Sequence, residues 1–186
     1  MGSFSPPPGP RSRFDTGRVV SQGPSGKTVL AIIVALVIAV YAWNKPPSKL
    51  HEQILQGLSA DGVATGVSSS AARCSGARGC LVIYVAPWCG PCRDSLPGDR
   101  ALADYLKEKG VETTFIVGMD KPAQCAEMAK KIGRDVLTDP SGSWAKKMHI
   151  NGVPHFLVTD VSGNVRRHQA GAMQAPPDAV AKALGL

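Results

Sequence analysis

The most constraining feature of the sequence is a pair of cysteines that directly follows an apolar run. The run is Leu81-Val82-Ile83-Tyr84-Val85-Ala86, and Trp88-Cys89-Gly90-Pro91-Cys92 comes after it. The lack of polar alternation in the run predicts a strand that is buried on both faces of a sheet. A C-x-x-C where a strand gives way to a helix is typical of a redox-active dithiol, because the helix N-terminus stabilises a thiolate on the first sulfur.

A second constraint is the apolar stretch of residues 28–43, which contains no charge, glycine or proline. Sixteen helical residues reach about 24 Å, somewhat less than the roughly 30 Å of a bilayer's hydrocarbon core. Tyr41 and Trp43 stand where interfacial aromatic residues are found. We interpret the stretch as a transmembrane anchor. The alternatives are a buried core helix and a signal peptide cleaved after Val40-Tyr41-Ala42.

The residues that flank this stretch predict its orientation. Residues 1–27 are rich in Pro, Gly and Ser and are expected to form a disordered tail with four basic residues, whereas Lys45 and Lys49 follow the stretch. The positive-inside rule then places the tail in the cytoplasm and residues 44–186 across the membrane. In a bacterium this predicts an inner-membrane protein with a periplasmic domain.

The charge bears on possible partners of the chain, and the cysteine count bears on possible disulfides. The net charge is +7, and residues 1–27 hold +3 of it, so +4 is spread over the remainder. This charge is too dispersed to predict a nucleic-acid partner. Five cysteines are an odd number, so at least one thiol stays unpaired within the chain. Cys125 is expected to be that residue, as a buried apolar side chain.

The domain at 44–186 predicts helices and strands in alternation. An amphipathic helix is expected over 49–58, with Leu50, Ile54, Leu55 and Leu58 on one face. After it we expect strands at 63–67, 81–85, 111–117, 153–159 and 165–169, and helices at 92–110, 122–132, 143–148 and 179–184. This order indicates an α/β domain with a central sheet of about four to five strands flanked by helices.

From about residue 49 to the C-terminus, the chain resembles the thioredoxin fold. The resemblance rests on the strand that leads into Trp88-Cys89-Gly90-Pro91-Cys92, on Val153-Pro154 at the start of the hairpin, and on Gly163 and Gly171 around its second strand. Within that superfamily, Cys92-Arg93-Asp94-Ser95-Leu96-Pro97 is similar to the C-R-x-x-x-P of membrane-anchored, TlpA-like thiol-disulfide oxidoreductases.

This resemblance implies an activity and its partners. It implies a reductase of disulfides in exported proteins, for example in cytochrome c or copper-site assembly, which draws electrons from a membrane or periplasmic donor. No cofactor and no metal are implied. The alternatives are an oxidase that introduces disulfides and a binding module that holds a partner without turnover.

The resemblance also implies the roles of the site residues. Cys89 is expected to be the exposed attacking cysteine, and Cys92 the resolving one. Pro154 matches the family's cis-proline, which faces the dithiol and prevents metal binding there. The backbone of Val153 is expected to pair with an extended substrate, and Trp88 to shield one side of the sulfurs.

The chain departs from the thioredoxin pattern at two positions. Ile83 stands where cytosolic thioredoxins have a buried aspartate that assists proton transfer, so Glu127 or a water is expected to substitute. His149 and His155 flank the expected cis-proline loop. Because His155 replaces a common Thr, it is a candidate for tuning the charge of the site.

A second cysteine pair, Cys74 and Cys80, has three open interpretations. A structural disulfide that holds the loop before the central strand fits an exported domain. A relay of electrons to or from Cys89 and Cys92 is the second. The third is a zinc site shared with the C-x-x-C, although five residues separate Cys74 from Cys80 and structural zinc favours two to four.

Overall fold

The structure, a computed structural model, describes residues 26–70 and 74–186. The chain divides into two compact units, Met1–Trp43 and Asn44–Leu186. Most of the expected disordered tail, residues 1–25, lies outside the described residues. Helix α1 (Gly26–Asn44) starts two residues before the apolar stretch of residues 28–43 and ends one residue after it.

Helix α1 is the described part of the first unit. Its residues 26–43 have a mean hydropathy of 2.1, and 0 % of them are buried. Nineteen helical residues reach about 28 Å, close to the thickness of the hydrocarbon core. Among the described residues, α1 is the one helix that is long and apolar enough to cross a membrane, judged by length and composition alone.

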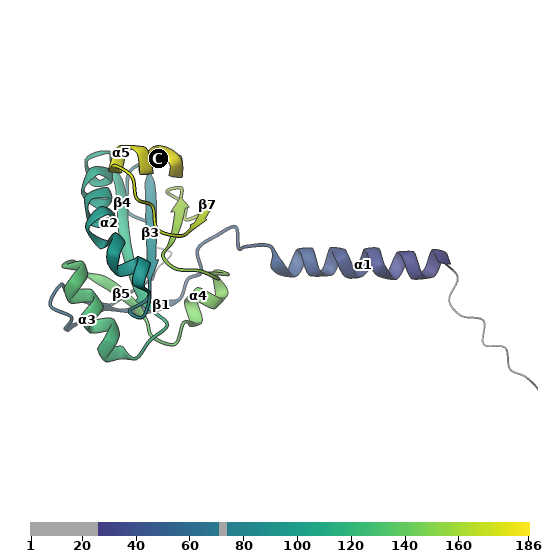
Figure 1. The fold of residues 1–186 in the computed structure, drawn as a ribbon, viewed down its shortest axis with the longest axis horizontal. Helices are drawn as coiled ribbons and strands as arrows, with labels where there is room; N and C mark the ends of the chain where they lie inside the picture. The colour runs from purple at the N-terminus through teal and green to yellow at the C-terminus, as the bar shows by residue number, and fades with distance from the viewer. Residues whose placement is uncertain (1–25, 71–73) are drawn as a thin grey trace, which may run out of the picture. The chain divides into compact units, whose positions relative to one another are not determined.

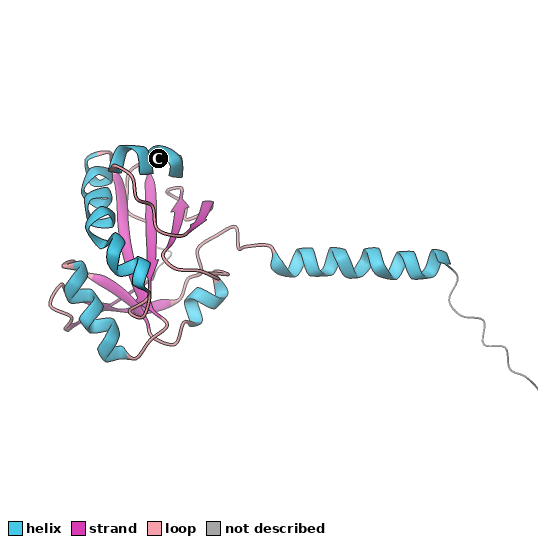
Figure 2. Cartoon of the chain, viewed as in Figure 1, coloured by secondary structure: helices cyan, strands magenta, loops and turns pink. Residues whose placement is uncertain are grey.

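The second unit is built on one sheet (Figures 1 and 2). Over the described residues the sheet has seven strands in the order β2-β1-β5-β4-β3-β6-β7. The strands are β1 (Ile54–Leu58), β2 (Ala64–Ser70), β3 (Gly79–Val85), β4 (Val111–Gly118), β5 (Val136–Asp139), β6 (His155–Thr159) and β7 (Val165–Ala170). β3, β4 and β5 are parallel, and the other pairs are antiparallel. The expected α/β class is confirmed, whereas the expected count of four to five strands is too low.

Helices cover both faces of this sheet (Figure 1). They are α2 (Gly90–Glu108), α3 (Pro122–Ile132), α4 (Ser143–Lys147) and α5 (Pro177–Leu184). Alternate residues of β3 point to opposite faces. Leu81, Ile83 and Val85 pack in one core with α2, α3 and α5, while Val82 and Tyr84 pack in the other with α4. All of β3 is buried, which confirms the predicted strand buried on both faces.

The amphipathic helix expected over 49–58 is wrong. Residues 54–58 form β1, which pairs antiparallel with both β2 and β5. Along it Ile54 is exposed, whereas Leu55 and Leu58 are buried in different cores. The leucine spacing is therefore also compatible with a strand that lies between two other strands. Gly57 lowers the helix propensity of this segment.

The remaining elements lie close to their expected positions, with one strand not predicted. The expected strands at 63–67, 111–117, 153–159 and 165–169 correspond to β2, β4, β6 and β7, and the helices after residue 90 start and end within two residues of expectation. β5 was missed because it has only four residues. It lies between the helix-ending Gly133, at φ 67°, and Pro140.

Candidate active site

The candidate active site lies where β3 ends and α2 begins. Cys89 is the N-cap residue of α2, and Cys92 lies in its first turn. The two form a disulfide with their Cα atoms 5.2 Å apart. The backbone N–H of Cys92 donates a hydrogen bond to Cys89 Sγ over 3.0 Å. When the disulfide is reduced, this N–H and the helix N-terminus are placed to stabilise a thiolate on Cys89.

The disulfide lies just below the surface, beside one exposed aromatic ring. Cys92 is fully buried and Cys89 is only 4 % exposed, so the exposure implied for Cys89 is not found in this oxidised form. Trp88 is 59 % exposed. Its indole Nε1–H donates to the carbonyl oxygen of Met119 over 2.9 Å, which anchors the ring at the rim of the site.

The loop before β6 lies against the disulfide. The Val153-Pro154 peptide bond is cis, and the carbonyl oxygen of Val153 lies 3.5 Å from Cys89 Sγ. The Pro154 carbonyl accepts a hydrogen bond from the N–H of Gly171 over 2.8 Å. Gly171 has φ +96°, a conformation that L side chains rarely adopt. The segment after β7 thus holds this loop in place.

Cys74 and Cys80 form a second disulfide at the other end of β3. Cys80 is the second residue of β3, and Cys89 comes four residues after the last residue of that strand, Val85. The strand between Cys80 and Val85 alone spans about 17 Å. Direct exchange between the two disulfides within one chain does not fit this separation, and neither does a zinc site shared by the four cysteines. Cys125 is unpaired and fully buried as expected, and burial raises the pKa of its thiol to about 11.

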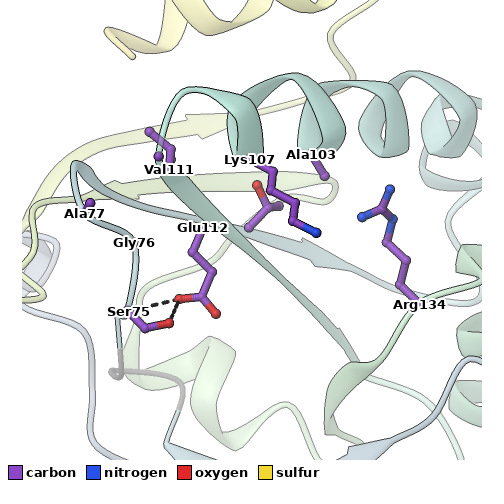
Figure 3. Close-up of a pocket in the computed structure, with 10 residues that line it drawn as sticks. Ser75, Gly76, Ala77, Ala103, Lys107, Val111, Glu112 and Arg134 are labelled. Atoms are coloured by element: carbon purple, nitrogen blue, oxygen red, sulfur yellow. Dashed lines mark hydrogen bonds between the residues drawn. The ribbon is translucent and has the colours of Figure 1, made fainter.

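A pocket of about 340 Å³ is lined by Ser75, the residue after Cys74, and by Glu112 (Figure 3). Glu112 accepts hydrogen bonds from both the backbone N–H and the hydroxyl group of Ser75, the former over 2.8 Å. The same carboxylate oxygen lies 3.8 Å from Cys80 Sγ. Lys107 and Arg134 line the other side of the pocket. These contacts tie the disulfide loop to β4, which supports the structural interpretation of Cys74 and Cys80.

The carboxylate proposed to replace the missing strand aspartate is not at the site. Ile83 is fully buried in β3. Glu127 lies on α3 with its side chain exposed and forms an ion pair with Lys130 at 2.7 Å. The hydrogen bond from Lys130 lowers the pKa of Glu127, which stays ionised in solvent. The expectation that Glu127 takes up the proton of Cys92 finds no support in this geometry.

Two functional candidates that sequence reasoning missed lie on α2. Ser95 and Asp99 are both buried, and Asp99 is only 2 % exposed. Ser95 Oγ lies 2.8 Å from Asp99 Oδ2 and 3.3 Å from the carbonyl oxygen of Cys92. Burial raises the pKa of Asp99 to about 6, against a smaller lowering by the Ser95 hydrogen bond. Ser95 and Asp99 come three and seven residues after Cys92, a spacing that puts all three residues on one face of a helix. This spacing is the signal by which the sequence could have identified them.

His155, beside the cis-proline loop, packs against a second histidine, His168. His155 Nδ1 lies 3.3 Å from the Gly152 carbonyl oxygen, and the His155 and His168 rings meet edge to face with their centroids 5.6 Å apart. Burial lowers the pKa of both imidazoles. Burial therefore disfavours the charged form of His155, and the charge-tuning role expected for it stays a prediction.

Comparison with known proteins places this site in context. The family model described as Redoxin matches residues 55–184, and no curated protein matches the chain. One similar solved structure is a putative thiol:disulfide interchange protein DsbE from Chlorobium tepidum, at 20% identity and TM-score 0.59, covering 74% of this chain and 94% of that one. Another is dsbF from MTB, at 19% identity and TM-score 0.58, covering 76% and 98%. These matches confirm the expected thioredoxin-like fold.

The same fold also occurs in a protein of a different class. A 2-Cys peroxiredoxin from Plasmodium vivax matches at 13% identity and TM-score 0.57, covering 76% of this chain and 95% of that one. At identities this low, a shared fold does not determine which reaction a protein catalyses. The reaction therefore has to be inferred from the residues at the site.

Proposed function

This chain belongs to the Redoxin family, and from that premise we propose that it is a membrane-anchored reductase of disulfides in exported proteins. Its enzyme class is thiol-disulfide oxidoreductase. The observation that carries the proposal is the hydrogen bond from the Cys92 N–H to Cys89 Sγ at the N-cap of α2. It supplies the stabilised thiolate that exchange chemistry requires.

The arrangement supports a two-step reduction. In the first step the Cys89 thiolate attacks one sulfur of a substrate disulfide, and the other substrate sulfur leaves as a thiolate. In the second step Cys92 loses its proton and attacks Cys89, which breaks the bond to the substrate and forms the Cys89–Cys92 disulfide. Two electrons pass to the substrate. The complete burial of Cys92 favours Cys89 as the attacking sulfur.

The surface around Cys89 suits an extended protein segment as substrate. Trp88 is a large exposed ring at the rim, and the Val153 carbonyl faces the sulfur. We expect a substrate strand to pair with the backbone of Val153 and to pack against Trp88. Gly90 and Pro91 between the cysteines favour the reducing type of thioredoxin-like protein over the disulfide-introducing type.

The location and the substrate class belong to the same proposal. The apolar stretch of residues 28–43 has four basic residues before it and only Lys45 and Lys49 directly after it, which favours export of residues 44–186. The Cys74–Cys80 disulfide suits an oxidising compartment such as the periplasm. A reductase there needs a membrane or periplasmic donor to reduce it again, and its substrates include exported proteins whose cysteines must be free, as in cytochrome c or copper-site assembly.

The first experiment measures the equilibrium of the Cys89/Cys92 pair in glutathione buffers of known poise. A potential near that of thioredoxin, about −270 mV, is expected of a reductase. A potential near −120 mV is typical of an oxidase and would reverse the proposed direction of electron flow.

A trapping experiment separates turnover from binding. Cys92→Ser should accumulate a mixed disulfide between Cys89 and its substrate, because the resolving thiol is gone. Cys89→Ser should accumulate none, and Cys125→Ser, which removes the unpaired buried cysteine and keeps both active-site cysteines, should behave as the wild type. If neither active-site variant changes the proteins that are retained, the chain is a binding module and not a reductase.

A further inference from the structure

Met119, the residue directly after β4, has a backbone conformation that its side chain disfavours. Its φ is 58°, in the left-handed region, where the Cβ atom of an L residue lies too close to the following carbonyl oxygen. Among the described residues other than glycine, only Met119 and His149 have a positive φ. Such a conformation persists where the surrounding structure holds it, so the contacts of Met119 point to what it serves.

The two backbone groups of Met119 bind to opposite sides of β4. Its N–H donates a hydrogen bond to the carbonyl oxygen of Asp139, the last residue of β5, over 3.1 Å. Its carbonyl oxygen accepts the indole N–H of Trp88, which follows β3, over 2.9 Å. β5 and β3 are the two neighbours of β4 in the sheet. An extended residue directs both groups to the same neighbour, so the left-handed turn is what brings this oxygen to Trp88.

The side chain of Met119 is also held. It is partly buried and packs against both cores of the domain. It lies against Gly142, where an added Cβ atom would come within 3.1 Å of Met119 Cγ. The N–H of Gly142 donates to the same Asp139 carbonyl oxygen over 2.9 Å. Backbone and side-chain contacts together therefore hold Met119 in its left-handed conformation.

We propose that Met119 is a positioning residue for substrate binding: its left-handed backbone directs its carbonyl oxygen to the Trp88 indole and fixes that ring as a preformed wall beside Cys89. This inference deepens the proposed function and rests on it. Met119 acts through Trp88 and takes no part in the exchange of bonds between sulfurs.

Fixing the ring affects binding and not bond exchange. Trp88 is 59 % exposed, so without its hydrogen bond the ring can take up several rotamers. A substrate that packs against a mobile ring has to order it, which weakens binding about 2- to 10-fold. The reactivity of the Cys89 sulfur depends instead on the Cys92 N–H and the N-terminus of α2. Loss of the hydrogen bond should therefore raise the substrate concentration that is needed, at an unchanged limiting rate.

Two substitutions at Met119 separate the effect of its backbone from that of its side chain. Glycine adopts the left-handed conformation without strain and keeps the carbonyl oxygen, although it removes the whole side chain. Valine keeps an apolar side chain, but its β-branch makes this conformation unfavourable. Met119→Val should therefore free the Trp88 ring more than Met119→Gly does. If the side chain of Met119 positioned the ring, the order would be reversed.

Hydrogen exchange of the indole N–H groups, followed by NMR on the full chain in detergent, measures the hydrogen bond. The resonance that is missing from Trp88→Phe identifies Trp88. Its exchange should be slow in the wild type and in Met119→Gly, and several-fold faster in Met119→Val. The indole N–H of Trp144 donates to the carbonyl oxygen of His51 over 3.1 Å and is the internal control, which should stay protected in every variant.

Single-turnover reduction by the reduced full chain measures binding. The probe is an extended synthetic peptide whose one cysteine is disulfide-bonded to an aromatic thiol, and the released aromatic thiolate gives the rate at each peptide concentration. Met119→Val should raise the half-saturating concentration about 2- to 10-fold at the wild-type limiting rate. Trp88→Phe, which keeps a ring and removes the N–H donor, should raise it to the same extent. A second probe, with 2-mercaptoethanol in place of the peptide, should react with Met119→Val as with the wild type.

The outcomes separate this inference from the proposed function. Equal half-saturating concentrations in Met119→Gly and Met119→Val, or a larger effect of Met119→Gly, overturn the inference. A wild-type value in Trp88→Phe overturns it as well, and this variant decides the matter should Met119→Val not unfold cooperatively in urea. A wild type that releases no thiolate from either probe overturns the proposed function instead.

Discussion

The burial of the Asp99 carboxyl group on α2 has a consequence for the stability of the fold. Its pKa is about 6 in the folded chain and 3.8 as a free side chain. Below about pH 3 the group is protonated in both the folded and the unfolded chain. As pH rises toward 6 the unfolded chain releases this proton first, so the free energy of unfolding falls, by about 3 kcal/mol in total. At pH 7 Asp99 therefore destabilises the fold.

We therefore predict that Asp99→Asn raises the free energy of unfolding at pH 7 by about 1–3 kcal/mol. The amide keeps the size of the side chain and a hydrogen-bond partner for Ser95, yet carries no charge. Urea unfolding at several pH values between 4 and 7 measures the effect. The gap between variant and wild type should widen across this interval, and a constant gap would contradict the pKa assigned to Asp99.

At the site, the sequence predicted the residues that form a local motif and missed those that depend on burial. Trp88, Cys89 and Cys92 lie within five consecutive residues, so their roles could be predicted from the sequence alone. The buried state of Asp99 could not be predicted in this way, because it arises only when α2 packs against β4 and α5. The expectation for Glu127 is not supported for the same reason, since the sequence does not show which face of its helix packs against the core.

Among the structural elements, β4 has close neighbours on both sides at its last residue, Gly118. A Cβ atom there would lie 2.0 Å from the hydroxyl oxygen of Tyr84 and 2.5 Å from the backbone oxygen of Asp139. That hydroxyl donates to the Asp139 carboxylate, which in turn accepts hydrogen bonds from the first residues of α4. A methyl group at Gly118 would disturb the sheet and this helix together.

We predict that Gly118→Ala lowers the free energy of unfolding by about 2–4 kcal/mol. The matched control is Gly98→Ala on α2, where nothing lies within 4 Å of an added Cβ. Because alanine favours the helix, this control should raise the free energy of unfolding by about 0.5–1 kcal/mol. Thermal or urea unfolding measures both, and equal effects of the two substitutions would contradict the close approach.

The loop closed by Cys74 and Cys80 should affect stability and not catalysis. Replacing both cysteines with serine removes a short cross-link, which we expect to lower the free energy of unfolding by about 2 kcal/mol. Turnover with a disulfide substrate should stay at the wild-type level, because Cys89 lies beyond the opposite end of β3. Lost turnover with unchanged unfolding would instead indicate an electron relay between the two pairs.

Elements were predictable where local signals and tertiary contacts agree. Helix α3 begins at Pro122 and ends before the left-handed Gly133, and both signals are visible in the sequence. Residues 54–58 lack such signals, and their strand conformation comes from pairing with β2 and with β5, of which β5 lies far along the chain. The number of strands was underestimated because β1 and β5 both depend on such pairing.

Over the whole molecule, the sequence and the structure divide the chain near residue 43. The two cores of the second unit consist of residues from Leu50 onward, and the apolar side chains of α1 are exposed. Exposed apolar surface on this scale is unfavourable in water and favourable in a bilayer. Stability of the fold and attachment to a membrane should therefore be separable properties.

We predict that residues 44–186 fold alone, remain in the aqueous phase, and keep the redox potential and urea midpoint of the full chain. The full chain should instead sediment with phospholipid vesicles and stay with them after a wash at high salt and high pH, because a spanning helix is held by apolar burial and not by charge. As a control, Leu36→Asp places one charge in the middle of α1 and should weaken this retention without altering the urea midpoint. A fragment that fails to unfold cooperatively would show that the N-terminal unit contributes to the fold. A full chain released by the wash would show that α1 does not span the bilayer.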